Sequence, residues 1–209
     1  MLITCVYKTG GDFDSDYVVA LYDSLKQYGD FLCFTDGDVP DYIPQAPLIH
    51  GWKGWWSKIE MIGCGEDTLC FDLDTIVLKD ISEMVKVAEQ SKEMIMLSDF
   101  YYPEKPASGL MYVPKETGTM LYNKFKEDSE LYMAKHRGDQ DYITSILSAK
   151  IERWDNLVGR DYIVSYKAHI AKTAPRHLNI KPVNVDNAKI VCFHGKPRPR
   201  DIKEFWNAG

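Results

Sequence analysis

Thr68-Leu69-Cys70-Phe71-Asp72-Leu73-Asp74 joins a mostly apolar run to two carboxylates. The run Thr68–Phe71 predicts a short buried strand that stops at Asp72. In extended backbone, side chains two residues apart point to the same side, so Asp72 and Asp74 are expected to converge. Converging carboxylates raise each other's pKa and cost stability unless a cation compensates. We therefore expect a cation site at this strand end; the structural alternative is that Asp74 caps a turn.

Strands and helices alternate on both sides of this segment. Before it, residues 2–7 and 31–35 read as strands, and residues 15–28 have helical spacing. After it, further elements are expected over residues 75–78, 81–90, 94–97, 109–113, 117–125, 142–149, 151–154, 162–166 and 190–193. The pattern predicts an α/β fold with a central mixed sheet flanked by helices. With 209 residues and 45% hydrophobic composition, residues 1–209 are expected to form a single domain.

Charge is distributed unevenly along the chain. The net charge is −6, which argues against a protein whose whole surface binds a polyanion. Residues 162–200, however, contain eight Lys and Arg against one Asp, a net charge of +7. This basic segment could bring phosphate-binding groups to carboxylates further upstream; the alternative is that it is simply solvated.

The cysteines and the N-terminal sequence bear on location. Five cysteines are present, none in a C-x-x-C pair, and Cys5, Cys33, Cys70 and Cys192 lie in apolar runs. Such thiols usually pack as small core residues, which favours a reducing setting. Residues 1–7 have no basic leader, and no apolar stretch approaches the roughly 18 residues of a membrane span. We expect a soluble, cytoplasmic protein.

A second candidate motif follows the last predicted strand, at His194-Gly195-Lys196. The imidazole of His194 could add a nitrogen ligand to an oxygen-rich cation site, which would suit Mn²⁺ or Mg²⁺ better than structural zinc. Gly195 permits close approach of the backbone, and Lys196 supplies a point charge for phosphate. The alternative for His194 is an ordinary hydrogen-bonded residue at a strand end.

Together these motifs resemble the GT-A nucleotide-sugar glycosyltransferases, especially their glycogenin-like and galactosyltransferase-like branch. Five blocks match in the same order over nearly the whole chain: Trp55-Trp56-Ser57-Lys58-Ile59-Glu60, Cys70-Phe71-Asp72-Leu73-Asp74-Thr75-Ile76-Val77, Ala107-Ser108-Gly109-Leu110-Met111, Gly138-Asp139-Gln140-Asp141 and Phe193-His194-Gly195-Lys196-Pro197. The second block resembles the DxD motif of that family, and the last resembles its C-terminal His-Gly-Lys-Pro element.

The resemblance implies a GT-A fold and a ligand set for the cation. Asp72, Asp74 and His194 would bind Mn²⁺ or Mg²⁺, which in turn would hold the diphosphate of the donor. Lys196 would pair with the diphosphate. The C-terminal element is shorter here than is usual, so Arg198 is a second candidate for this contact.

The resemblance also implies roles for residues of the other blocks. Tyr7, Lys8 and Asp36 would hold the nucleoside. The donor sugar or its phosphates would contact residues that several strand and helix ends supply, namely Lys58, Asp72, Asp99, Ser108, Gly109 and Gly195. Asp139 and Gln140 would lie near the anomeric carbon, with Asp139 or Asp141 as the base if the reaction inverts configuration.

The implied activity is transfer of a hexosyl or pentosyl group from a nucleotide-diphosphate sugar, with UDP as the expected nucleotide, to an acceptor hydroxyl. The glycogenin-like resemblance favours retention of configuration. The acceptor stays open among a glycan, a protein, a metabolite and a hydroxylated nucleic-acid base. Tyr101 and Tyr102, in a loop flanked by prolines, are candidates for stacking on it.

Two other functions fit part of the pattern. A phosphatase of the haloacid-dehalogenase type would use Asp72 as its nucleophile, but that family places its Asp pair on the first strand. Here two strand–helix units come first. A non-catalytic module that binds nucleotide sugars would keep the donor pocket without transferring the sugar.

Overall fold

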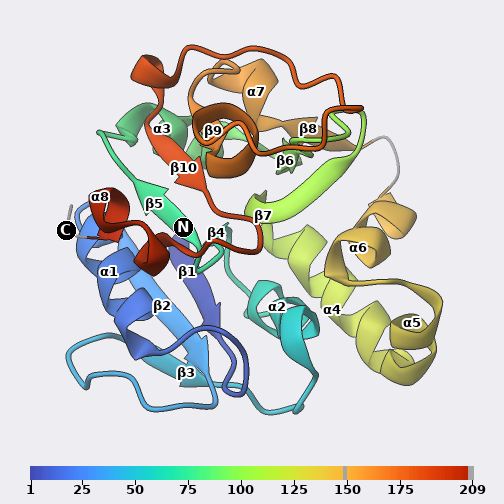
Figure 1. Ribbon diagram of the computed structural model, residues 1–209. Coiled ribbons are helices and arrows are strands. Elements are labelled where there is room, and N and C mark those ends of the chain that lie inside the picture. The colour runs from blue at the N-terminus through green and yellow to red at the C-terminus, as the bar shows by residue number, and fades with distance from the viewer. Residues whose placement is uncertain (148–149, 207–209) are drawn as a thin grey trace.

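The centre of the protein is a seven-stranded sheet with the order β3-β2-β1-β4-β7-β6-β8 (Figure 1). The structure, a computed structural model, describes residues 1–147 and 150–206. The strands of this sheet are β1 (Leu2–Tyr7), β2 (Asp30–Thr35), β3 (Gln45–Pro47), β4 (Thr68–Phe71), β6 (Met94–Ser98), β7 (Pro106–Val113) and β8 (Ile151–Arg153). A second, three-stranded sheet has the order β5-β10-β9, formed by β5 (Thr75–Val77), β9 (Ile163–Ser165) and β10 (Ile190–Cys192).

Strand direction changes beside β4. This strand runs parallel to β1 but antiparallel to β7, so that Phe71 lies opposite Leu110. Because β2 is also parallel to β1, the carboxyl ends of three strands share one edge of the sheet. β7 begins at that same edge. Crevices beside the carboxyl ends of strands are where open α/β sheets bind ligands.

Helices cover both faces of the large sheet, and the alternation of side chains along β4 explains how. Leu69 and Phe71 pack into the core beneath α1 and α3, whereas Cys70 belongs to the core beneath α2, α4 and α6. The helices are α1 (Ser15–Leu25), α2 (Ser57–Ile62), α3 (Ser82–Gln90), α4 (Lys115–Glu127), α5 (Ser129–Lys135), α6 (Asp139–Leu147), α7 (Trp154–Leu157) and α8 (Lys203–Trp206). Short helical turns add η1 (Gly54–Trp56), η2 (Tyr166–Ile170), η3 (Val185–Asn187) and η4 (Pro199–Asp201).

The predicted α/β architecture with a central mixed sheet is confirmed. Besides the short turns η1 to η4, the elements β3, α5, α7 and α8 were not predicted. β3 contains Pro47 and lies at the sheet edge, where proline is tolerated, and α5 buries none of its residues and so has no apolar stripe. The helix predicted over residues 142–149 begins earlier, at Asp139, and its last two positions lie outside the described residues.

Two further features bear on the setting of the chain. Across residues 1–147 and 150–206, no helix has the length and apolar character needed to cross a bilayer. All five cysteines are free, and Cys5, Cys33, Cys70 and Cys192 are buried, as expected for thiols that pack as core residues.

Candidate active site

The two aspartates after β4 lie in a turn. The backbone N–H of Thr75 donates to the carbonyl of Asp72 at 3.1 Å, so the chain leaves the extended path at Leu73. The predicted extended geometry of the Asp pair is therefore wrong. The turn buries Leu73, which is 5% exposed, in the core beneath α1 and α3. The two carboxylates are still close enough that the charge of Asp72 raises the pKa of Asp74.

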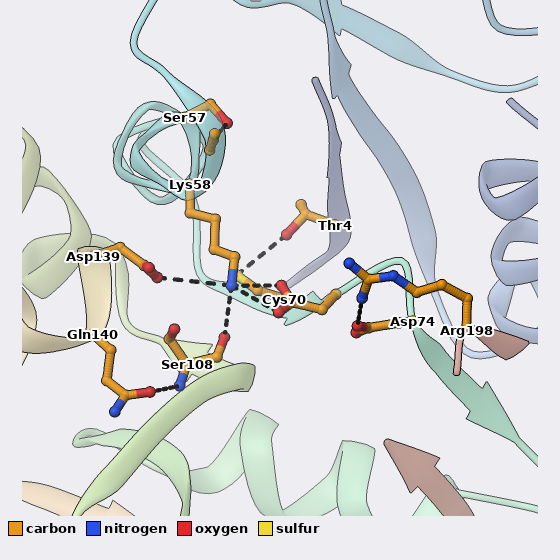
Figure 2. A network of polar contacts seen from close by, with 11 residues as sticks. Thr4, Ser57, Lys58, Cys70, Asp74, Ser108, Asp139, Gln140 and Arg198 are labelled. Carbon is orange, nitrogen blue, oxygen red and sulfur yellow. Dashed lines mark hydrogen bonds and ion pairs between the residues drawn. The ribbon is translucent and has the colours of Figure 1, made fainter. Parts of the chain in front are cut away.

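Lys58 is the centre of a buried polar cluster at this strand end (Figure 2). Its Nζ lies 2.6 Å from Asp72 Oδ1 and 3.7 Å from Asp139 Oδ2. Nζ also donates to the carbonyl of Ser108 at 3.3 Å. The side chains of Lys58 and Asp139 are only 12% and 5% exposed. We call Lys58, Asp72, Asp139 and Ser108 the lysine cluster; its members come from α2, the end of β4, α6 and β7.

Burial and charge oppose each other within the lysine cluster. Burial alone would lower the pKa of Lys58, but Asp139 and Asp72 raise it above its ordinary value. Burial raises the pKa of Asp72, and Lys58 limits that rise. Within the described residues, Asp139 Oδ2 is buried without a hydrogen-bond partner. A fixed ammonium thus faces an unsatisfied carboxylate oxygen, and convergent perturbed groups of this kind are typical of functional sites.

The predicted residues around the lysine cluster divide into those that reach it and one that does not. Ser108 N donates to Gln140 Oε1 at 3.3 Å, and the carbonyl of Gly109 accepts from Asp72 N at 2.9 Å. Gly109 is close enough to Asp72 that a Cβ on it would lie 3.7 Å from Oδ2. Asp141 is exposed, because residues two apart on a helix point to different faces. The site therefore gathers Asp139 and Gln140 but not Asp141.

Asp74 is paired with Arg198, which comes from the other end of the chain. Arg198 Nη1 lies 2.6 Å from Asp74 Oδ2, and its Nη2 lies 3.2 Å from Asp12 Oδ2 (Figure 2 shows the first contact). The guanidinium also stacks over Phe13, 4.4 Å from the ring centroid. Burial and the neighbouring Asp72 raise the pKa of Asp74 to about 7, although Arg198 lowers it. Arg198 thus compensates a carboxylate that is costly to bury.

The segment that carries Arg198 is tied to the start of α1 a second time. Arg200 Nη1 lies 2.5 Å from Asp14 Oδ2, and its Nη2 lies 2.7 Å from Asp16 Oδ2. Its guanidinium also stacks over Trp206, at 4.9 Å. We call residues 194–201 the C-terminal arm. It is drawn in red in Figure 1, between β10 and α8.

His194 begins the C-terminal arm, but its ring is engaged away from the aspartates. Its Nε2 lies 2.6 Å from Ser165 Oγ, and the ring stacks on Phe100 with centroids 5.4 Å apart. Burial and the nearby Lys167 lower the pKa of His194 to about 4, so the imidazole is neutral. In the described part of the chain, no three His, Cys, Asp or Glu side chains are grouped so as to hold a metal ion. His194 as a third ligand beside Asp72 and Asp74 therefore stays a prediction.

The residues predicted to hold the nucleoside lie together at the ends of β1 and β2. Lys8 forms an ion pair with Asp36, and Thr9 N donates to Asp36 Oδ1 at 2.8 Å. Desolvation raises the pKa of Asp36, but the bonds from Lys8 and Thr9 outweigh it and lower the pKa below its usual range. The ring of Tyr7 lies against Gly37, where a Cβ would sit 2.9 Å from a ring carbon. Glycine therefore leaves room for the tyrosine ring.

Asp99 follows β6 and organises the loop predicted to face the sugars. Its Oδ1 accepts hydrogen bonds from the backbone N–H groups of Tyr101 and Tyr102, at 2.8 and 2.9 Å. The loop presents Tyr101 edge-on to His194, with centroids 5.1 Å apart. Asp99 is also close enough to His194 to raise its pKa, against the stronger effect of burial.

Lys167 was not among the predicted site residues. It lies on η2, and its Nζ would be 3.2 Å from a Cβ placed on Gly195, whose φ is +83°. Burial and Arg198 lower the pKa of Lys167, and Asp74 opposes them, so its ammonium lies among the groups of the site. Lys196, the residue predicted for the diphosphate, is exposed and forms no ion pair within residues 1–147 and 150–206.

One sequence signal for the C-terminal arm was overlooked. Asp12, Asp14 and Asp16 alternate with other residues, and so do Arg198 and Arg200. The acidic residues and the arginines both recur at every second position and carry opposite charge. This match could have indicated that the start of α1 and the C-terminal arm lie together.

Comparison with known proteins places this geometry in a fold. No protein-family model and no curated protein sequence matches the chain. Solved structures do match. The glycosyltransferase GlyE of Streptococcus pneumoniae TIGR4 superposes with a TM-score of 0.69 at 12% identity, over 98% of this chain and 59% of GlyE. The chain thus spans less than two thirds of that protein.

Two other structures match over more of their own length. The galactosyltransferase LgtC, solved with donor and acceptor sugar analogues, has a TM-score of 0.65 at 12% identity, over all of this chain and 92% of LgtC. A glycosyltransferase involved in glycosylation of the major capsid of PBCV-1 has a TM-score of 0.58 at 12% identity, with both chains covered completely. A haloacid-dehalogenase architecture is not favoured. The chain has the GT-A fold of nucleotide-sugar glycosyltransferases.

Proposed function

We propose that this protein is a glycosyltransferase that moves a hexosyl or pentosyl group from a UDP-sugar to an acceptor hydroxyl, with retention of configuration. The observation that carries the proposal is the pairing of buried acids and bases at the carboxyl edge of the sheet. Lys58 faces Asp72 and Asp139, and Arg198 faces Asp74, at the position where α/β folds bind nucleotides. The GT-A fold supports a nucleotide-sugar donor.

A divalent cation, Mn²⁺ or Mg²⁺, is part of the proposal. Asp72 and Asp74 fit it, because they are adjacent oxygen donors and burial raises the pKa of both. Such cations are commonly held by one or two carboxylates, with substrate phosphates and water as the other ligands. His194 would be a third protein ligand. When bound, the cation neutralises charge that develops on the diphosphate as the sugar leaves.

The basic side chains of the site have a matching task. Arg198 holds Asp74 at 2.6 Å and Asp12 at 3.2 Å, and Asp12 is half exposed. A guanidinium with one exposed partner can turn to a diphosphate, which binds it in the same bidentate manner as a carboxylate. Lys167 and Lys196 lie on either side of Gly195 and would add point charges to the leaving group.

The reacting centre of the donor sugar is assigned to the start of α6. Asp139 Oδ2 has no hydrogen-bond partner within the described residues, and Lys58 Nζ lies 3.7 Å from it. We propose that this oxygen and the amide of Gln140 face the anomeric carbon, where they stabilise the positive charge that develops as the bond to phosphate breaks. Retention does not require Asp139 to remove a proton from the acceptor.

Hydrolysis of a panel of UDP-sugars to UDP and free sugar, with Mn²⁺ present and water in place of the acceptor, tests the function. Asp74→Asn and His194→Ala should lower this rate at least about 100-fold, the loss typical of removing a group that stabilises developing charge. Asp23→Asn, in an exposed ion pair with Lys26, is the matched control and should keep the wild-type rate. Mn²⁺ binding measured by calorimetry gives a second readout, and undiminished release by Asp74→Asn would refute the assignment.

The non-catalytic alternative makes the opposite prediction. A binding module would take up a UDP-sugar, measured by calorimetry, yet release no UDP with any acceptor or with water. A haloacid-dehalogenase phosphatase would instead hydrolyse an aryl phosphate and form a phosphoryl adduct on Asp72, detectable by mass spectrometry.

Cytoplasmic location is also a proposal. It is supported by five free thiols, of which Cys5, Cys33, Cys70 and Cys192 are buried. Mass spectrometry of the natural protein under non-reducing conditions tests it, and a disulfide among these cysteines would contradict it.

A further inference from the structure

A cavity of about 360 Å³ lies beside the small sheet, lined by residues of the segment 168–183. Residues 171–184 form a loop without helix or strand, between η2 and η3. The charged and polar side chains that line the cavity are His169, Lys172, Arg176 and Lys181, and no carboxylate is among the lining residues. We call this space the basic cavity. Its volume lies within the range of about 300–1,000 Å³ in which small-molecule sites are found.

The basic cavity adjoins a second cavity that reaches the loop after β6. A neighbouring cavity shares His169, Lys181 and Val183 with it and is also lined by Asp99 and Phe100. Phe100 stacks on His194, the first residue of the C-terminal arm. On the other side, Ser165 joins the two regions, because its Oγ lies 2.6 Å from His194 Nε2 and its backbone N–H donates to His169 Nδ1 at 3.0 Å. A molecule in the basic cavity would therefore lie near the loop that Asp99 organises, on the side of His194.

The positive charges of the basic cavity are not neutralised by the protein. In the part of the chain that the structure describes, Lys172, Arg176 and Lys181 form no ion pair. All three are exposed, so they can reach a ligand without being desolvated first. By contrast, Arg198 and Arg200 of the C-terminal arm each contact two carboxylates. Within the basic segment 162–200, Arg198 and Arg200 are therefore paired with carboxylates, whereas Lys172, Arg176 and Lys181 are not.

Three carboxylates lie near the cavities, and each accepts hydrogen bonds from the protein. Asp161, which raises the pKa of His169 against the stronger effect of burial, accepts from Asn184 N at 3.0 Å. Asp99 Oδ1 accepts two backbone hydrogen bonds, and Asp155 Oδ1 accepts one from Ser98 Oγ at 2.7 Å. His169 adds a donor: its Nδ1 accepts from Ser165 N, so in the neutral ring the proton is on Nε2. A neutral N–H donor beside three free cations complements a group that carries a negative charge and several acceptor oxygens.

We infer that the basic cavity binds a phosphate or carboxylate group of the acceptor, and that the acceptor is an anionic sugar. The inference rests on the proposed function. A compact cavity favours a sugar over a nucleic acid, whose recognition needs a basic surface long enough to follow the backbone. Residues 1–161 carry a net charge of −12, which disfavours a basic surface of that length.

Binding measured without donor tests the cavity by itself. The probes are glucose 6-phosphate, glucuronate, uncharged glucose and a single-stranded oligodeoxynucleotide, titrated by calorimetry into the full chain. The two anionic sugars should bind at least 10-fold more tightly than glucose. The double variant R176E/K181E should lose at least 10-fold in affinity for glucose 6-phosphate. Lys124→Glu, with the same kind of charge change at an exposed position of α4, should lose nothing.

Three outcomes would overturn the inference. Glucose that binds as tightly as glucose 6-phosphate would show that charge is not recognised. Unchanged affinity in R176E/K181E would place the anion elsewhere. Tighter binding of the oligonucleotide than of the sugar phosphate would assign the basic residues to a nucleic acid.

Release of UDP in the absence of acceptor separates this inference from the proposed function. R176E/K181E should release UDP from the UDP-sugar at the wild-type rate, because neither side chain is among the residues assigned to the cation, the diphosphate or the anomeric carbon. If the variant lost UDP release together with sugar-phosphate binding, the anion would occupy the diphosphate site and the inference would fail. If no form of the protein released UDP while selective sugar-phosphate binding persisted, the proposed function would fail and the cavity would stand.

Discussion

The two halves of the site are held together in different ways. Lys58 and Asp139 of the lysine cluster are almost completely buried, and their neighbours come from four elements of the protein body. The C-terminal arm reaches the same crevice with Arg198 and Arg200, whose partners at the start of α1 are half exposed or more. Both halves pair a cation with two carboxylates, so the chemistry is the same and only the surroundings differ.

The difference in burial indicates which half of the site can exchange its ion-pair partners when a ligand binds. A buried ion pair is costly to break, because the charge left behind is desolvated and uncompensated. An exposed pair is screened by water and salt and is worth little. We therefore expect the lysine cluster to be a fixed scaffold and the arm to exchange its partners. The three cations Lys58, Arg198 and Arg200 form a series of increasing exposure, and their removal tests the idea.

Lys58→Ala should have the largest effect on stability. It leaves the buried Asp139 and the partly buried Asp72 without a counter-charge, and the expected loss in the free energy of unfolding is about 3–5 kcal/mol. Urea denaturation at pH 7 measures it. Lys124→Ala, at an exposed position of α4, should change stability by no more than about 0.5 kcal/mol. A Lys58→Ala loss as small as that of the control would mean that the cluster is not a scaffold.

Arg198→Ala should cost less, about 1–3 kcal/mol, because only Asp74 is left buried without a partner. The cost should also depend on pH. The pKa of Asp74 is raised to about 7, and removing Arg198, which lowers it, raises it further. At a pH below the pKa of Asp74 the carboxyl group is neutral and needs no cation. At a higher pH, the variant must either keep an unpaired charge in a buried place or protonate the group at a cost. The loss in the free energy of unfolding, measured by urea denaturation with EDTA present, should therefore be larger at pH 8 than at pH 6. Equal losses at the two pH values would contradict the idea that Arg198 compensates a charged Asp74.

Arg200→Ala should have the smallest effect, roughly 0.5–1 kcal/mol, because its side chain is 37% exposed and its partners are more exposed still. Added salt discriminates the two arginines. Raising NaCl from 50 mM to 1 M should abolish most of the difference between Arg200→Ala and wild type, and leave most of the Arg198→Ala difference. A salt response shared equally by both variants would show that the arm has no buried part.

The sequence was informative where a local pattern corresponds to a local structure. The apolar run before Asp72 predicted β4, and the resemblance of the ordered blocks predicted the GT-A fold that the structural matches support. The structure brings Lys58, Asp72 and Asp139 together, and the roles that the resemblance implied for them stay predictions.

Other features depend on tertiary contacts that no local pattern encodes. The turn at Leu73 replaces an extended strand because the core beneath α1 buries that leucine. The contact of Arg198 with Asp12 joins residues 186 positions apart, and only the folded sheet edge brings them together. Lys167 could not be distinguished from the other basic residues of its segment, because what singles it out is its position beside Gly195.

The contact between the C-terminal arm and the start of α1 has a consequence for how the molecule assembles. The contacts from Arg198 and Arg200 to Asp12, Asp14 and Asp16 span 184 to 186 positions. Closing so long a loop costs chain entropy before any contact compensates it. We therefore expect these contacts to form late in folding, after the sheet that supports them. An incompletely folded chain would then expose an open acidic crevice that repels a diphosphate, so that only the finished molecule would accept its donor.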